Sequence, residues 1–139
     1  MIETKRIFLD TAPIIYFVEN KPGYVETVAD LIAANPEAEY FTSVISITEY
    51  LPYPLKQPNR DELIRRFDRF ITEAEIAVVD IDRQIATEAA RIRAEWPSFK
   101  TMDALQLATA LAHGCDLFLT NDKQLRQFKA IPCKTMEDI

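Results

Sequence analysis

The sequence predicts an α/β protein, a three-layer α/β/α sandwich around a mostly parallel sheet of four to five strands. Short apolar runs alternate with segments of helical periodicity along the chain. Parallel strands need crossover connections, which are usually helical and almost always right-handed. With 139 residues, the chain is long enough for one domain with a full core and too short for two, so we expect a single domain over residues 1–139.

The strands are predicted from apolar runs that are short and rich in β-branched or aromatic residues. Such runs are typical of buried strands in a parallel sheet. Four of them are well defined, and a fifth is possible near the carboxyl terminus. They cover Arg6–Leu9, Tyr40–Thr42, Ile76–Ile81, Leu117–Thr120 and, for the possible last strand, Ala130–Pro132.

Helices are predicted where apolar residues recur three and four positions apart. One of them starts at Ser43 or Ser46 and ends near Leu51, because Pro52, Pro54 and Pro58 are expected to stop it and impose an extended loop. The other helical segments are Thr11–Val18, Tyr24–Ala34, residues 61–71, residues 85–96, Thr101–His113 and Lys123–Phe128.

Composition excludes several classes of protein. No apolar run approaches the roughly 20 residues of a membrane helix, and the amino terminus carries no export signal, so we expect a cytoplasmic protein without a membrane partner. The net charge of -6 argues against broad attraction to nucleic acid, although a cation held by acidic residues can still meet a phosphate. Cys115 and Cys133 lack the spacing of a zinc or redox pair and are interpreted as buried or semi-buried thiols.

Four acidic residues fall where strands or loops lead into helices: Asp10, Glu49, Asp103 and Asp122. Asp10 and Asp122 follow predicted strands, and Glu49 lies in the helix that leaves the second strand. Asp103 begins a helix that must run antiparallel to the strand after it. In a parallel sheet, all four positions therefore lie at the carboxyl edge, where ligands of such folds bind.

Carboxylate oxygens are hard ligands that suit Mg²⁺ or Mn²⁺. We expect Asp10 and Asp103 to hold the principal ion, with Glu49 and Asp122 completing its shell directly or through water, while a second ion could enter with substrate. Clustered carboxylates repel one another, which should raise their pKa values until a cation neutralises them.

Each acid also has a structural explanation. Asp10, Asp103 and Asp122 could cap or begin helices, since a carboxylate accepts hydrogen bonds from the unpaired backbone donors there. Ser46 and Glu49 fit a capping box. These explanations do not account for an acid at every junction of the right orientation.

The chain resembles the PIN-domain family, and within it the small VapC-type toxins of toxin–antitoxin pairs. Four segments carry the resemblance in the family's order and cover most of the chain. They are Phe8–Thr11, Ser43–Glu49, Thr101–Ala110 and Asp116–Asp122.

The resemblance implies a metal-dependent ribonuclease that hydrolyses RNA phosphodiester bonds, with the same four acids as its catalytic site. Thr120 matches a hydroxyl position beside that site, Asn121 is its neighbour, and Thr11 could approach it. Lys100, beside Asp103, is a candidate phosphate contact, whereas Asp116 lies at the start of its strand and is given a structural role.

The resemblance also implies an RNA substrate and an antitoxin that covers the acidic cleft, placing an Arg or Lys against its carboxylates. Trp96 and the segment Pro52–Leu55 suggest a homodimer, because exposed apolar residues often mark interfaces.

Other functions remain open. A phosphatase with an aspartyl nucleophile usually needs a second acid two residues after the first, where this chain has Ala12, and a phospho-acceptor receiver domain needs an acidic pair that is missing near Asp10. The non-enzymatic alternative is a binding module or scaffold whose acids only cap helices.

Overall fold

The computed structural model describes residues 6–139, and its centre is one five-stranded sheet. All neighbouring strands are parallel, in the order β3-β2-β1-β4-β5, which confirms the predicted fold class. Residues 1–5, which belong to the predicted domain and to the amino terminus predicted to lack an export signal, lie outside the described residues. The strands are β1 (Arg6–Leu9), β2 (Glu39–Ser43), β3 (Ile76–Val79), β4 (Leu117–Thr120) and β5 (Cys133–Thr135).

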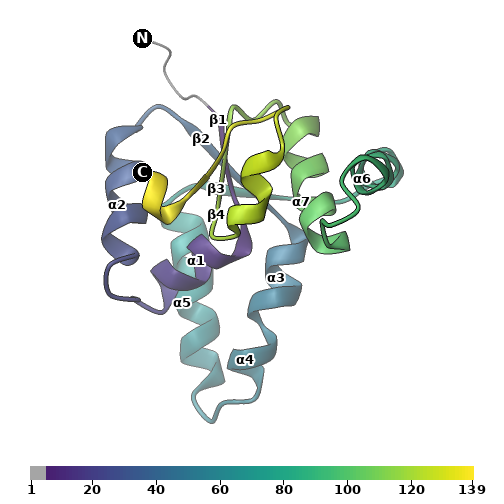
Figure 1. Cartoon of the computed structure of the whole chain (residues 1–139). Coiled ribbons are helices and arrows are strands. Elements are labelled where there is room, and N and C mark those ends of the chain that lie inside the picture. Colours follow the sequence, from purple (N-terminus) through teal and green to yellow (C-terminus); the bar gives the residue numbers. More distant parts are fainter. Residues whose placement is uncertain (1–5) are drawn as a thin grey trace.

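Helices cover both faces of this sheet (Figure 1). Helices α1, α2, α3 and α5 contribute buried side chains to one face, whereas α6, α7 and η1 contribute theirs to the other. The helices are α1 (Thr11–Val18), α2 (Val25–Ala34), α3 (Val44–Tyr50), α4 (Pro52–Leu55), α5 (Arg60–Glu73), α6 (Arg83–Glu95) and α7 (Thr101–Ala112), with the 3-10 helices η1 (Lys123–Gln127) and η2 (Met136–Asp138).

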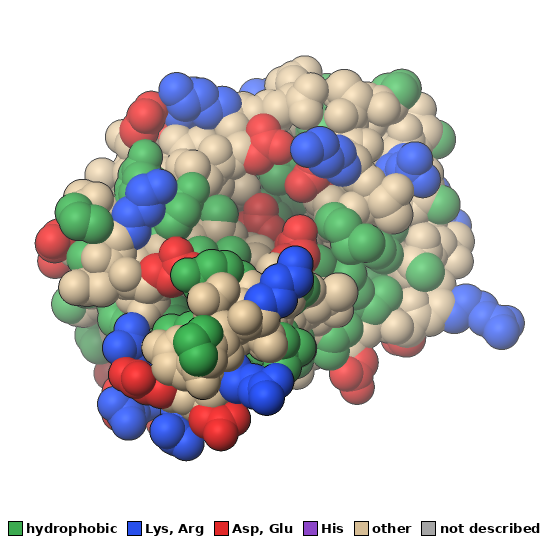
Figure 2. Space-filling model, turned by 90° about the horizontal axis from the view of Figure 1, so that it is seen from below, with side chains coloured by type: hydrophobic (Ala, Val, Ile, Leu, Met, Phe, Trp, Pro, Cys, Tyr) green, Lys and Arg blue, Asp and Glu red, His purple; other side chains and the backbone are tan. Residues whose placement is uncertain are grey.

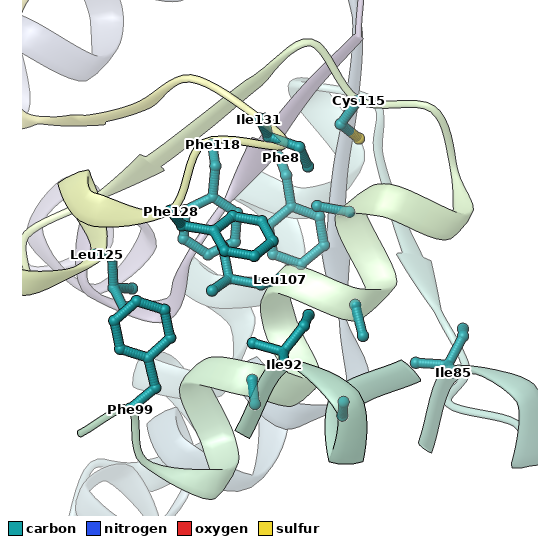
Figure 3. Close-up of a cluster of buried hydrophobic side chains, with 14 of the residues drawn as sticks. Phe8, Ile85, Ile92, Phe99, Leu107, Cys115, Phe118, Leu125, Phe128 and Ile131 are labelled. Carbon is teal, nitrogen blue, oxygen red and sulfur yellow. The ribbon is translucent and has the colours of Figure 1, made fainter. Parts of the chain in front are cut away.

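The central strands are buried on both faces, and their side chains alternate between two apolar cores. In β1, Ile7 and Leu9 join the core under α1, α2 and α5, while Phe8 points into the core under α6 and α7. Figure 3 shows the second core, where Phe8 stacks on Phe118 of the neighbouring strand at 5.2 Å between ring centroids. This packing fixes the register that brings the ends of β1 and β4 together.

The predicted extended loop after Leu51 is wrong, because Pro52–Leu55 forms the short helix α4. Pro52 and Pro54 lie in its first turn, where the missing N–H groups have no partner within the helix in any case. The chain turns after α4, and α5 begins at Arg60.

The possible last strand at Ala130–Pro132 is also misplaced. The strand is formed by Cys133–Thr135, which pairs in parallel with β4 from Phe118 to Thr120. Pro132 has no N–H to donate and contributes only its carbonyl, which accepts a hydrogen bond from Phe118 N at 2.9 Å.

Both cysteines are free, Cys115 being buried and Cys133 half-buried. Burial raises the pKa of each thiol to about 12, so both are protonated at neutral pH. This agrees with their interpretation as packing residues. Within residues 6–139, no helix combines the length and apolar character that crossing a membrane requires.

Candidate active site

The four acids predicted from the sequence come from segments that end or begin at the carboxyl edge of the sheet. Asp10 directly follows β1, and its backbone N–H donates to Leu119 O at 2.9 Å, which continues the β1–β4 pairing. Asp122 follows β4, Glu49 lies in α3 after β2, and Asp103 lies in the first turn of α7. Figure 2 views the molecule from below, toward this edge, and shows a hollow where acidic side chains gather, with Lys and Arg side chains around it.

Asp10 is partly buried, and both of its carboxylate oxygens accept hydrogen bonds. One oxygen accepts from Thr11 N at 2.9 Å and from Gln106 Nε2 at 3.4 Å. The other oxygen accepts from Thr120 Oγ1 at 2.8 Å. The carboxylate therefore caps α1, as its structural explanation predicts, and is at the same time oriented by side chains from β4 and α7.

Thr11 connects Glu49 to this network. Its hydroxyl donates to Glu49 Oε1 at 2.6 Å and lies 3.1 Å from Ser46 Oγ. Glu49 is therefore drawn toward the start of α1. The predicted capping box is wrong, because Ser43 is the N-cap of α3, accepting from Ile45 N at 3.1 Å, and Ser46 is buried inside the helix.

Asp103 and Asp122 also accept backbone hydrogen bonds at the starts of their helices. Asp103 Oδ2 accepts from Lys100 N at 3.2 Å, and Asp122 Oδ1 accepts from Gln124 N at 3.0 Å. These bonds fit the structural explanation for each residue. Each bond leaves the other carboxylate oxygen without a hydrogen bond, within the described part of the chain, so capping does not use up the ligand capacity of either group.

Electrostatics joins the four carboxylates. Burial raises the pKa of Asp10 to about 6, and the charges of Asp103 and Glu49 act in the same direction, against the hydrogen bonds from Thr120 and Thr11. Burial is also the main cause of the raised pKa of Asp103, to which the charges of Asp122 and Glu49 contribute. The backbone N–H and the charge of Lys100 oppose that increase. The predicted mutual repulsion is thus present at Asp10 and Asp103.

The residues present fit Mg²⁺ or Mn²⁺ as a partly hydrated ion. Among residues 6–139, no three acidic, His or Cys side chains form a closed set around one point. Mg²⁺ usually retains several waters and binds through only one or two carboxylates, so it does not require a closed set. The acidic side chains offer only oxygen ligands, which such a cation prefers. Its positive charge would also lower the raised pKa values of Asp10 and Asp103.

The other predicted site residues differ in whether they contact the carboxylates. Thr11 and Thr120 contact the carboxylates directly, as described above. Asn121 instead donates through Nδ2 to the Tyr16 hydroxyl at 2.9 Å. Lys100 is exposed beside Asp103, whereas Asp116 accepts from Arg6 N at the opposite edge of the sheet, in keeping with a structural role.

Gln106 was not singled out from the sequence, although it connects three parts of the site. Its side chain is fully buried, donates to Asp10 and, at 3.3 Å, to Ser46 Oγ, and accepts from Ser43 Oγ. The available signal was its position, three residues after Asp103 in an otherwise apolar stripe of α7. A buried Gln must find partners, and these partners come from the junction of β1 with α1 and from the start of α3.

With this geometry established, comparison with known proteins identifies the family. A model of the PIN domain matches residues 7–131. This chain belongs to the PIN-domain family. No curated protein matches the sequence.

Solved structures share the PIN fold with this chain at low sequence identity. FitAcB from Neisseria gonorrhoeae has a TM-score of 0.78 and 18% identity, with 96% of this chain and 99% of that chain covered. DNA-bound VapBC from Salmonella typhimurium has a TM-score of 0.75 and 24% identity, with coverage of 95% and 98%. Mycobacterium tuberculosis VapC20, described as a sarcin-ricin loop cleaving toxin, has a TM-score of 0.62 and 15% identity, with coverage of 81% and 86%.

Proposed function

We propose that this PIN-domain protein is a Mg²⁺- or Mn²⁺-dependent endoribonuclease and the toxin of a toxin–antitoxin pair, acting in the cytoplasm. The proposal is supported by four carboxylates, from four separate segments, that lie near the carboxyl edge of the sheet and whose charges act on one another. Burial and, to a smaller extent, the neighbouring carboxylates raise the pKa values of Asp10 and Asp103. This arrangement does not benefit the fold, because like charges in a partly buried site destabilise the folded state.

Each acid has a proposed part. Asp10 and Asp103 would hold the ion, and Glu49 and Asp122 would reach it directly or through its waters. When bound, the ion supplies the positive charge that lowers the pKa of water and stabilises the charge developing on a phosphodiester. The chain itself orients the ligands: Thr120, Gln106 and Thr11 N fix the Asp10 carboxylate, and Thr11 Oγ1 restrains Glu49.

RNA is the proposed substrate because of the family and its solved relatives, one of which is described as cleaving the sarcin-ricin loop. The rim of the hollow supports this choice, since cationic side chains surround it in a protein whose net charge is -6 (Figure 2). Exposed Lys100 is the proposed phosphate contact nearest Asp103. Lys123 is less available, because it pairs with Glu137 at 3.3 Å.

An antitoxin is the proposed protein partner, because several structural neighbours are VapBC or toxin–antitoxin complexes. A segment that places an Arg or Lys against the carboxylates would neutralise them as a cation does and would exclude substrate. A small reading frame next to the gene would support this part of the proposal.

The central experiment compares Asp103→Asn with the wild-type protein. The variant retains the size of the side chain and loses the charge that binds the cation, so we expect Mg²⁺-dependent cleavage of single-stranded RNA to fall at least about 100-fold, as for loss of one electrostatic contact at a transition state. The variant should stay folded, since Asp103 is partly buried with a raised pKa.

Asp68→Asn is the matched control, because Asp68 is an exposed carboxylate on α5, outside the acidic site. It should cleave RNA at the wild-type rate. Unchanged cleavage by both Asp103→Asn and Asp10→Asn would contradict the proposal.

A non-catalytic binding module is the alternative, because three of the four acids do accept hydrogen bonds at helix starts. Titration with Mn²⁺ separates the two functions. A ligand that binds only the folded protein stabilises it by about 2.7 kcal/mol at 100 times its dissociation constant. We expect the melting temperature of the wild-type protein, but not of Asp103→Asn, to rise with millimolar Mn²⁺. A wild-type protein that does not respond would favour the binding module.

A further inference from the structure

The turn between α1 and α2 holds a lysine that no part of the proposed chemistry uses. Lys21 is exposed, and its ammonium lies 4.3 Å from the ring centroid of Tyr16 and 5.0 Å from that of Tyr24. The two rings stack on each other at 4.8 Å with an angle of 18° between their planes. The cation is therefore held by two aromatic rings, an arrangement that attracts it through the ring quadrupoles.

This lysine has no carboxylate partner among residues 6–139, unlike Lys123 and four of the arginines. The backbone at this residue is also held in place, since Lys21 N donates to Tyr16 O at 2.8 Å and Lys21 O accepts from Val25 N at 3.0 Å. An unpaired cation in a fixed position is suited to meet an external anion, because little conformational freedom is lost when the anion binds.

A hydrogen bond ties this turn to the acidic site. Asn121 Nδ2 donates to the Tyr16 hydroxyl at 2.9 Å, and Asn121 lies between Thr120, which contacts Asp10, and Asp122. Figure 1 shows α1 leaving β1 at the lower end of the sheet and the α1–α2 turn staying at that end before α2 rises to β2. The turn that contains Lys21 is thus on the same side of the molecule as the carboxyl edge of the sheet.

We propose that Lys21, held on Tyr16 and Tyr24, is a contact for the RNA backbone beside the acidic site, where it binds a phosphate of the strand whose cleavage is proposed above. This inference rests on the proposed function. The Tyr16–Asn121 hydrogen bond positions the contact relative to Asp122, and the aromatic pair holds the ammonium at the turn. A single-stranded RNA would then meet a cation at the metal and a second, permanent cation at Lys21.

The test measures binding of a fluorescent single-stranded RNA oligonucleotide by anisotropy between 50 and 200 mM KCl, with Mg²⁺ present. Asp103→Asn serves as the background, so that the RNA is not cut. Each neutralised phosphate of a single strand contributes about 0.7 to the slope of log K against log salt concentration. Lys21→Gln should therefore reduce the slope by about 0.7, and its defect should shrink about 2.6-fold over this fourfold range of salt.

Lys129→Gln is the matched control. Lys129 is exposed in the loop that leads to the start of β5, at the opposite edge of the sheet. Its substitution removes the same charge as Lys21→Gln. It should leave both affinity and slope at the background values. Tyr16→Phe keeps the ring but loses the bond to Asn121, so we expect weaker binding with an unchanged slope.

Equal slopes for Lys21→Gln and Lys129→Gln would overturn this inference while leaving the ribonuclease proposal intact. Failure of the wild-type protein to cleave RNA, together with failure of the background to bind it, would overturn both. Circular dichroism spectra and melting temperatures of the Lys21 and Lys129 variants should match the background, since both side chains are exposed.

Discussion

Asp10 shows at the scale of one residue how the site opposes stability. Its pKa is about 6 in the folded protein, compared with an ordinary value of 3.8, so the folded state retains a proton that the unfolded chain has already released. The contribution of Asp10 to the free energy of unfolding therefore falls as the pH rises from about 4 to about 6, and the full destabilisation is present above pH 6.

Replacing Asp10 with Asn should remove this cost. We expect Asp10→Asn to stabilise the metal-free protein by about 1–3 kcal/mol at pH 7.5 and to have little effect at pH 4, as measured by urea denaturation. Asp68→Asn should show no such pH dependence. A stability difference that is the same at both pH values would show that repulsion and burial at Asp10 are not its origin.

The buried side chain of Gln106 should contribute to both stability and activity. Gln106→Leu keeps the volume of the side chain but leaves Ser43 without its buried acceptor, so unfolding should become easier by about 1–3 kcal/mol. Cleavage should fall as well, because Asp10 and Ser46 lose a donor that orients them.

Gln84→Leu is the control for Gln106, because Gln84 is an exposed glutamine on α6. Its effect on the free energy of unfolding should stay within about 0.5 kcal/mol. Equal stability of the two variants would contradict the role assigned to the buried glutamine.

The sequence indicated the four acids but not the groups that orient them. An acid at a strand end is visible in one short segment, whereas the partners of Gln106 lie 60 to 96 positions away. A single Gln in an apolar stripe does not reveal which segment it will face. The same limit applies to Tyr16, whose link to Asn121 spans 105 positions.

At the scale of elements, helix starts are fixed by capping residues. Asp82 caps α6, and its Oδ1 accepts from Ile85 N at 2.9 Å. Asp82→Ala should lower stability by about 1 kcal/mol without changing cleavage, because α6 covers the core and carries none of the four acids. Asp80→Ala, an exposed residue in the same loop, should be within about 0.5 kcal/mol of the wild-type protein in thermal unfolding.

Strands β1, β2 and β4 could be predicted because they are almost entirely buried, which leaves a strong apolar pattern, and the edge strand β3 could be predicted from its β-branched residues. Strand β3 ends at Val79, two residues earlier than predicted, where its pairing with β2 ends. The last strand lacks such a pattern, since it has only three residues, Cys133–Thr135, of which one is a lysine, and it follows a proline. Helix α4 was missed because proline is a helix breaker only beyond the first turn.

At the scale of the whole molecule, only one of the two apolar segments that led us to predict a homodimer is exposed enough to form its interface. Trp96 is half-buried and stacks on Phe99 at 5.4 Å, so it belongs to the core rather than to an interface. Tyr53 and Leu55 of α4 remain 58% and 50% exposed.

We therefore expect a dimer through α4 at micromolar concentration, which Leu55→Asp should convert to monomers, because a buried charge without a partner is costly. Light scattering measures both states, and Lys56→Asp is a neighbouring surface control that tests whether added negative charge alone is enough. A wild-type protein that is monomeric at this concentration would contradict the predicted dimer.

The strand order has a consequence for how the protein is made. Strand β1 begins the described chain yet lies between β2 and β4, so the central position of the sheet is completed only by a strand that starts at Leu117. The last of the proposed ligands, Asp122, follows that strand. A nascent chain on the ribosome would thus carry Asp10 long before β4 and Asp122 have been synthesised, so the four carboxylates could not come together until that late segment had folded.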